Sequence, residues 1–357
     1  MHFGIMTEAC MVGDISEIDK VPTAEDFRVR YQGVIEEALL ADELGYSVFG
    51  TSEQHFYAPM CTVASGELFL AAVAAQTKNI KIRTSITLLP FHQPVRVAEQ
   101  IATLDLLSNG RVEFGSGKGN STKTAGGFGI DLSETDARWK EAMDIVISAW
   151  ADDEFSYDGK FYKVPPRQLC PKMIQRPHPP LWYAAISPSS HEKAARMGMG
   201  VMSLTAGVDL RQLEKRVKIY REAIKNPQPY RDLVQDKFSV YVLAHCAETT
   251  EQARKEAEPP MLAYLKGVVE LYENTMKASG NQLDFTKTRE TVSNFKLLDE
   301  TDNVIVGDPE TIIKKIKRYE SLGVDEIFFR MEGLPHDKVM KSIRLIGEHV
   351  IPHFKKK

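Results

Sequence analysis

Closely spaced cysteines are missing from this sequence. No two of its cysteines have the CxxC spacing of a zinc site or a redox pair; they are Cys10, Cys61, Cys170 and Cys246. A disulfide framework is equally unsupported, because such frameworks belong to short chains that are dense in cysteine. No group of Asp, Glu and His residues has the spacing of a metal site either. We therefore expect reduced thiols and no bound metal.

An excess of positive charge is also missing. The formal net charge is -4, and the one basic run is the terminal Lys355–Lys357. Proteins that bind nucleic acid or an anionic membrane usually carry a basic patch, so neither partner is expected. No apolar stretch is long enough to cross a bilayer, and the opening MHFGIMTEAC lacks the basic-then-apolar layout of a signal peptide. We expect a cytoplasmic protein.

Two common nucleotide-binding fingerprints are absent as well. The first apolar segment runs into TEACMVGD, residues 7–14, which lacks the Gly-rich turn of a dinucleotide-binding fold. The segment FGSGKGNSTK, residues 114–123, has Gly119 after Lys118, where a P-loop requires Ser or Thr. These absences argue against a nicotinamide site and against a P-loop nucleotidase.

What the sequence does have is a regular alternation of short apolar segments with segments of helical period. The predicted strands cover residues 2–6, 47–53, 80–89, 111–117, 181–187, 201–204, 238–246 and 325–331. Eight strands, each followed by a helix, are typical of a (β/α)8 TIM barrel. We predict one barrel domain over residues 1–357; a doubly wound sheet is the alternative, disfavoured by the missing Gly-rich turn.

Two segments interrupt the alternation and are interpreted as insertions, around residues 155–180 and 260–303. In the first, alternating aromatics flank Asp158-Gly159, which predicts a β-hairpin, and a Pro-rich loop follows. Residues 249–279 are predicted to be helical with a break at Pro259-Pro260. Residues 280–303 are polar, and we expect them to be irregular.

A polar stretch, SEQHF, follows the second predicted strand at residues 52–56. Chemistry in a (β/α)8 barrel takes place at the C-terminal ends of the strands, which makes Glu53, Gln54 and His55 candidate catalytic residues. A strand end that merely reaches solvent would be polar too. Of the three, His55 is the candidate general acid or base, because a histidine exchanges protons near neutral pH and an amide does not.

Two further segments are candidates for binding a ligand. Lys118 lies between Gly117 and Gly119, and these glycines allow a ligand to approach the backbone. A surface lysine on a flexible loop is the alternative interpretation.

Three serines, Ser187, Ser189 and Ser190, stand just before a predicted helix. A helix N-terminus offers free N–H groups and the positive end of its dipole, and hydroxyl groups beside it complete an anion site. Plain N-capping would need one serine only.

These blocks, in this order, resemble the bacterial luciferase-like flavin monooxygenases over roughly the whole chain. The resemblance rests on residues 52–56, on TSITLLPFHQPVRVAEQIATLDLLSNGRVEFGSGKG (84–119), on residues 157–164 and 176–190, and on VIVGDPETI (304–312). It implies a (β/α)8 barrel that uses reduced FMN and O2. In that chemistry O2 adds to the flavin C4a atom, and the hydroperoxide oxygenates a small organic substrate. It also implies a separate flavin reductase and is compatible with a homodimer through the helices after the second and third strands.

The resemblance assigns residues at the second and third strand ends. The family pattern is Glu-His-His-Phe, so Gln54 takes the place of the first histidine and can only form hydrogen bonds, whereas Glu53 and His55 keep the family identity. A non-prolyl cis peptide that lies against the flavin ring in the family falls on Ser85 and Ile86.

At the fourth and fifth strands the resemblance assigns the phosphate. The family arginine near the flavin phosphate falls on Lys118, and the residues that hold the phosphate fall on Ser187 and Ser190. Three other functions remain open: hydride transfer with a deazaflavin in the same superfamily, a non-catalytic flavin-binding barrel, and a metal-dependent barrel hydrolase, which lacks ligands.

Overall fold

The computed structural model describes residues 1–12, 21–205, 208–278 and 286–355. Parallel strands close into an eight-stranded barrel, in which the last strand pairs with the first. In order around the barrel they are β1 (His2–Thr7), β2 (Val48–Thr51), β3 (Lys81–Thr84), β5 (Val112–Gly117), β8 (Leu181–Ala184), β9 (Gly200–Leu204), β10 (Phe238–Cys246) and β12 (Glu326–Arg330). Each overlaps a segment predicted as a strand, and the (β/α)8 prediction is confirmed.

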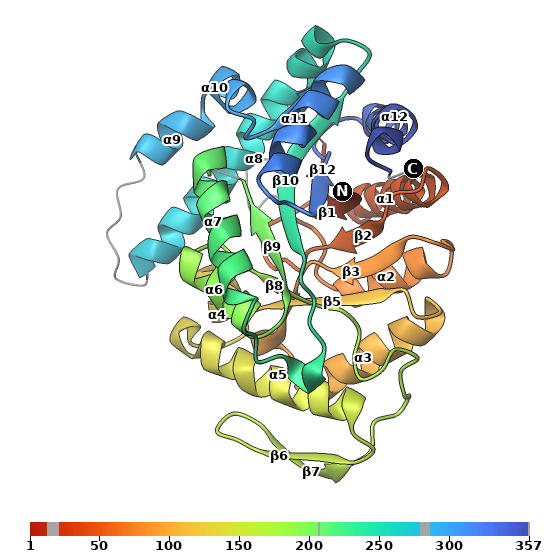
Figure 1. The fold of residues 1–357 in the computed structure, drawn as a ribbon, viewed down its shortest axis with the longest axis vertical. Helices are drawn as coiled ribbons and strands as arrows, with labels where there is room; N and C mark the ends of the chain where they lie inside the picture. The colour runs from red at the N-terminus through yellow and green to blue at the C-terminus, as the bar shows by residue number, and fades with distance from the viewer. Residues whose placement is uncertain (13–20, 206–207, 279–285, 356–357) are drawn as a thin grey trace.

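A helix follows every barrel strand, and these helices surround the barrel (Figure 1). They are α1 (Ala24–Glu43), α2 (Gly66–Ala74), α3 (Pro94–Leu107), α5 (Thr135–Ala151), α6 (Pro188–Arg196), α7 (Leu210–Ala223), α8 (Thr250–Ala278) and α12 (His336–Leu345). The other elements are β4 (Thr87–Leu88), α4 (Thr122–Gly127), β6 (Phe155–Asp158), β7 (Lys163–Arg167), α9 (Thr286–Val292), α10 (Phe295–Glu300), β11 (Ile305–Gly307) and α11 (Pro309–Ser321). The predicted hairpin is present as β6 and β7, which project from the barrel (Figure 1).

Two predictions for residues 249–303 are wrong. The helix α8 is continuous through Pro259 and Pro260, where we expected a break. Pro260 lies against Gly333 in the loop after β12, and such tertiary packing overrides the local preference of proline. Residues 286–300 are not irregular, since they form α9 and α10, the latter capped by Asn294. Residues 280–285 of the same prediction lie outside the described part of the chain.

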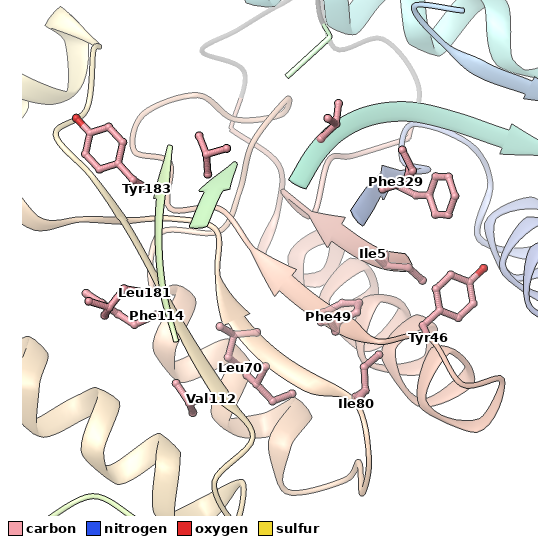
Figure 2. Close-up of a cluster of buried hydrophobic side chains, with 14 of the residues drawn as sticks. Ile5, Tyr46, Phe49, Leu70, Ile80, Val112, Phe114, Leu181, Tyr183 and Phe329 are labelled. Carbon is pink, nitrogen blue, oxygen red and sulfur yellow. The ribbon is translucent and has the colours of Figure 1, made fainter. Parts of the chain in front are cut away.

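The outer face of the barrel carries the main hydrophobic core. Side chains such as Ile5, Phe49 and Phe114 alternate along the strands and are buried between the strands and the surrounding helices (Figure 2). The alternation of apolar residues that predicted these strands therefore arises from the side chains that point outward, toward the helices. This packing fixes the strands whose opposite face lines the interior.

The inner face is built from glycines and a few large side chains. A Cβ atom on Gly4 or Gly50 would lie 2.6 or 2.8 Å from the Phe328 ring, and one on Gly115 would lie 2.7 Å from the Met202 Cε atom. All five residues therefore face the barrel axis. The absence of a side chain at these glycines leaves the space that the Phe328 ring and the Met202 side chain occupy.

Replacing Gly115 by alanine is expected to lower the free energy of unfolding by about 1–3 kcal/mol, the usual cost of overpacking. The new Cβ would lie 2.2 Å from the Thr84 carbonyl oxygen, a backbone atom that moves only if β3 moves. Chemical denaturation measures the loss. Gly126→Ala is the matched control, because outside its own helical turn no atom of the described residues lies within 4 Å of its Cβ position. Equal stability of the two variants would contradict the inner-face packing.

Candidate active site

Toward the C-terminal ends of the strands, the interior of the barrel is open to solvent. Four inward side chains line it there: Met6, Ser85, Ala184 and Tyr241. Met6 pairs with Gly50, Ala184 with Met202 and Tyr241 with Phe328, so each shares the inward face of its partner. The Ser85 Oγ atom also points inward, 2.6 Å from the Cβ position of Gly50. Met6, Ala184 and Tyr241 are partly exposed although they point inward, so solvent reaches the barrel interior at this level.

The Ser85–Ile86 peptide bond is cis, as predicted. It lies between β3 and β4, at the edge of this open level. The Ile86 Cδ1 atom occupies the space beside Gly117, 2.1 Å from the position where a Cβ would stand, and the Ala184 Cβ lies 3.7 Å from the same point. The structure thus brings Ser85, Ile86 and Gly117 together, and Gly117 is required because Ile86 fills its side-chain position.

The three serines form one hydroxyl cluster at the N-terminus of α6. Ser187 Oγ lies 2.9 Å from Ser189 Oγ and donates to Ser190 Oγ at 3.1 Å. Ser187 is also the N-cap, since its Oγ accepts from the Ser190 N–H at 3.2 Å. Ser187 and Ser189 are exposed and Ser190 is half-buried. The cluster therefore presents hydroxyl groups to solvent at the positive end of a helix dipole.

Positive charge lies beside this cluster. Lys193, one turn further along α6, donates to the Asp136 carboxylate at 2.8 Å. Burial raises the pKa of Asp136, but the hydrogen bond and charge of Lys193 and the charge of Lys118 outweigh it and lower that pKa. Lys118 is exposed at the end of β5. Two ammonium groups thus act on the Asp136 carboxylate, and one of them, Lys193, lies on the same helix as the hydroxyls. Lys193 was missed because its helix position carries no motif.

A buried histidine, His191, connects the serine cluster to the barrel strand β9. His191 Nδ1 lies 2.8 Å from the Ser187 carbonyl oxygen, and its Nε2 lies 2.9 Å from Ser203 Oγ on β9. In the neutral ring, Nδ1–H donates to the carbonyl and Nε2 accepts from the hydroxyl. Burial lowers the pKa of His191 to about 4. The ring therefore ties the N-terminus of α6 to the barrel in its neutral form.

A second group of polar side chains lies at the ends of β2 and β4. Glu53 is buried, and its Oε1 atom lies 2.7 Å from His55 Nε2 and 2.8 Å from His92 Nε2. Its Oε2 atom accepts from the Leu88 N–H at 2.8 Å. Burial alone would raise the pKa of Glu53, but the hydrogen bonds from His55, His92 and Leu88 outweigh burial. The pKa is therefore lowered, and the carboxylate is ionised. Glu53 and His55 are therefore joined as the motif predicts, and His92 joins them from the loop after β4.

Gln54 is separated from this group. Its backbone N–H donates to the Val63 carbonyl at 2.9 Å, and its side-chain amide makes no hydrogen bond to the described residues. The Phe128 ring instead packs on His55, with ring centres 4.8 Å apart, and Phe56 and Phe91 lie beside Phe128. These aromatic side chains shield one side of the imidazole.

Ser52 and Arg330 each carry a polar atom of the inner face that has no hydrogen-bond partner among the described residues. Ser52 and Arg330 lie two residues beyond the inward Gly50 and Phe328, and both are buried. Ser52 Oγ and Arg330 Nη2 have no hydrogen-bond partner within the described residues. Arg330 Nε donates to Glu8 at 3.0 Å, and its guanidinium lies 3.6 Å from the centre of the Tyr264 ring on α8. Sequence reasoning missed these residues, although strict alternation from Gly50 and Phe328 would have placed them inward.

Other site classes find little support. Within the described ranges no group of three His, Cys, Asp or Glu side chains can hold a metal ion. All four cysteines are free thiols, and only Cys170 is exposed. None of the described helices has the length and apolar character needed to span a membrane.

A family model, described as luciferase-like monooxygenase, matches residues 1–326. The chain belongs to the luciferase-like monooxygenase family. One relative is the oxygenase component of a flavin-dependent trigonelline monooxygenase from Acinetobacter baylyi, 24% identical over 343 residues, which cover 94% of this chain and 93% of that protein. Family members are oxidoreductases, and the predicted family is confirmed.

Solved structures agree with the barrel. The monooxygenase RslO1 from Streptomyces bottropensis superimposes with a TM-score of 0.80 at 26% identity, over 99% of this chain and 100% of that chain. The oxygenating constituent of 3,6-diketocamphane monooxygenase from Pseudomonas putida, solved in complex with FMN, has a TM-score of 0.78 at 21% identity, over 99% and 98%.

Relatives that use a deazaflavin are also present. An F420-dependent glucose-6-phosphate dehydrogenase from Microbacterium testaceum is 25% identical over 332 residues, which cover 91% of this chain and 94% of that protein. Membership of the family therefore does not identify the flavin, and the choice between FMN and F420 has to be argued from the residues of the site.

Proposed function

We propose that this protein is an FMNH2-dependent monooxygenase that transfers one oxygen atom of O2 to a small organic substrate. The observation that carries the proposal is the cluster of hydroxyl groups of Ser187, Ser189 and Ser190 at the N-terminus of α6. Lys118 follows β5, which pairs with the β8 strand that precedes these serines. A separate flavin reductase would supply the reduced cofactor, as for an oxygenase component. We expect the protein to work in the cytoplasm.

The donors of the site fit FMN. Exposed hydroxyls, helix N–H groups and an ammonium suit a terminal phosphate. Inside the barrel, Ser52 Oγ and Arg330 Nη2 are buried and have no hydrogen-bond partner among the described residues, and such a donor costs about 1–3 kcal/mol. A ring with several acceptor atoms, such as isoalloxazine, would satisfy them. Ile86 and Ala184, which lie together beside Gly117, offer the ring an apolar contact surface.

The chain's own residues then have separate tasks. When bound, reduced FMN supplies the oxygen chemistry, and the protein binds it, orients it and keeps water away. The serine cluster and Lys118 hold the phosphate end. His55, fixed by the buried Glu53 carboxylate, gives or takes a proton at the ring edge that faces away from Glu53. Gln54 contributes hydrogen bonds only.

Lys118→Met is expected to weaken FMN binding by about 10–100-fold, the value of one hydrogen bond to a charged group, and to leave riboflavin binding unchanged. Riboflavin lacks the phosphate that Lys118 would contact. Titration calorimetry with both flavins measures the difference. Lys78→Met is the matched control, since Lys78 is an exposed lysine that precedes β3, at the opposite end of the barrel strands from the serines, which follow β8. An equal loss for both flavins would place Lys118 away from the phosphate.

Rapid mixing tests the oxygenase function directly. Protein with photoreduced FMN is mixed with oxygenated buffer, and the flavin absorbance is followed in time. Reoxidation in several phases, slower than that of free FMNH2, supports the proposal. Reoxidation at the rate of free FMNH2 contradicts it.

Hydride transfer with a deazaflavin is the second candidate. It is favoured by the F420-dependent relative and by Gln54, which stands where the family has a histidine. Anaerobic titration with reduced FMN and reduced F420 separates the two. Tighter binding of reduced F420 than of reduced FMN would contradict the monooxygenase function and favour hydride transfer.

A homodimer through α2 and α3 is also part of the proposal. These two helices are neighbours, and each exposes leucines: Leu68 on α2 is 70% exposed, and Leu107 on α3 is 56% exposed. Large exposed apolar side chains on adjacent helices are typical of an interface.

A further inference from the structure

One carboxylate oxygen serves two imidazoles in this protein. Glu53 Oε1 lies 2.7 Å from His55 Nε2 and 2.8 Å from His92 Nε2, while Oε2 is occupied by the Leu88 N–H. Because both rings donate Nε2–H to the same oxygen, only the Nδ1 atom of each remains for proton exchange. Neither Nδ1 has a partner in the part of the chain that the structure describes, nor is either a buried unpaired atom.

We propose that His55, Glu53 and His92 form one proton-sharing unit, in which His92 is a positioning residue that acts on His55 through Glu53. This proposal rests on the proposed function, because it concerns the acid–base group of that site. His92 lies in the loop after β4, so the unit joins the end of β2 to the end of β4.

Charge sharing is the physical basis of the unit. A single negative charge between two imidazoles stabilises one extra proton, whereas a second would place two positive charges on opposite sides of one oxygen atom. The charge state of His92 therefore changes how strongly Glu53 holds the proton of His55. The charges of the two imidazoles are therefore coupled through the Glu53 carboxylate that both contact.

The surrounding groups favour a proton on His92. Burial lowers the pKa of His92, but the hydrogen bond and charge of Glu53 and the charge of Glu67 on α2 raise it above its ordinary value. Glu67 is held in place by a hydrogen bond from Thr87 at 2.8 Å. On the other side, Phe128 packs against His55 and carries no charge. The side-chain amide of Gln54 touches neither ring through a hydrogen bond.

The proton step is balanced within this unit. When protonated His55 acts as an acid, its Nδ1–H bond breaks and the electron pair stays on Nδ1. The proton forms an O–H bond on the acceptor oxygen of the substrate. Glu53 remains ionised and then holds the proton of His92 with its full charge, and His55 regains a proton from solvent. No electron is transferred in this step.

Proton titrations of the histidine ring signals by NMR, on the flavin-free protein, test the coupling. His55→Gln keeps an N–H donor toward Glu53 but removes one titrating charge. We expect the His92 titration to move to higher pH by about one pH unit in this variant, as for sites that interact strongly. The reciprocal change is expected for His55 in His92→Gln, because linkage acts equally in both directions. Glu53→Gln should move the His92 titration to lower pH.

His336→Gln is the matched control. His336 also pairs with carboxylates, Glu36 and Glu37, but at the N-terminus of α12. It should leave the His92 titration unchanged. An unchanged His92 titration in His55→Gln, together with an unchanged His55 titration in His92→Gln, would overturn the proposal. Because no flavin is present, failure of the proposed function, seen as absence of FMN binding, is measured separately.

Discussion

Arg83→Met is expected to lower the free energy of unfolding by about 3–5 kcal/mol, the usual cost of removing one partner of a buried ion pair. Arg83 is 1% exposed inside the barrel, where it donates to Glu113 at 2.7 Å and to Glu326 at 2.6 Å. Its guanidinium also lies 3.8 Å from the centre of the Trp182 ring. Methionine fills part of the volume but removes the buried cation that Glu113 and Glu326 share, and Glu113 keeps only the exposed Lys81. Guanidinium chloride denaturation at neutral pH measures the loss.

The pH dependence of this loss has a defined sign. In the native protein burial raises the pKa of Glu113, but Arg83 and Lys81 lower it more, so its pKa lies below the ordinary value. Its contribution to stability is thus present above the unfolded pKa and is lost as the pH falls through the folded one. Without Arg83, protonation relieves the two carboxylates. The difference between variant and native protein should therefore shrink as the pH is lowered toward 5.

Lys81→Met provides the control for this experiment. Lys81 bonds the same Glu113 at 2.6 Å, but its side chain is 54% exposed, so we expect a loss of less than about 1 kcal/mol. Similar losses for Lys81→Met and Arg83→Met would contradict the role of burial. If replacing Arg83, Glu113 and Glu326 together by apolar residues restores stability, the cost lies in unpaired charge and not in lost packing.

The barrel could be predicted from the sequence because its outer face follows a simple rule. Strands such as β1 and β10 carry alternating apolar residues that must be buried under helices, and this period of two is visible without a structure. The course of α8 through Pro259 and Pro260 could not be predicted, because it depends on packing against Gly333, far away in the sequence. Local propensity is outweighed there by tertiary contact.

The site was predictable to the extent that its residues are adjacent in sequence. Glu53 and His55, and the three serines before α6, are short motifs, and the structure keeps each group together. His92 is 39 positions from Glu53 along the chain, and nothing in its neighbourhood indicates a carboxylate partner. Arg330 likewise becomes a candidate only when the register of β12 shows that it points inward. The positions of His92 and Arg330 in the site depend on how the strands are arranged in the closed barrel, which the sequence around each residue does not show.

Acidification is expected to destabilise the protein through His191, and this effect is large for a single side chain. Burial lowers the pKa of His191 to about 4, whereas an unfolded histidine has a pKa of about 6.5. Between these values the unfolded chain binds a proton that the folded protein does not, so stability falls as the pH decreases. The loss accumulates to roughly 3 kcal/mol at pH 4. Denaturation curves across this range measure the slope.

His191→Gln isolates this contribution. Glutamine can still donate to the Ser187 carbonyl and accept from Ser203, but it does not titrate. The slope between pH 4 and 6.5 should therefore become shallower in the variant, and the two slopes would coincide if His191 were protonated in the fold. Since Ser187 caps α6 and belongs to the hydroxyl cluster, a charged His191 would disturb the proposed phosphate site before the barrel unfolds. FMN affinity should then decline with acid at a pH where the barrel is still folded, and it should do so less in His191→Gln.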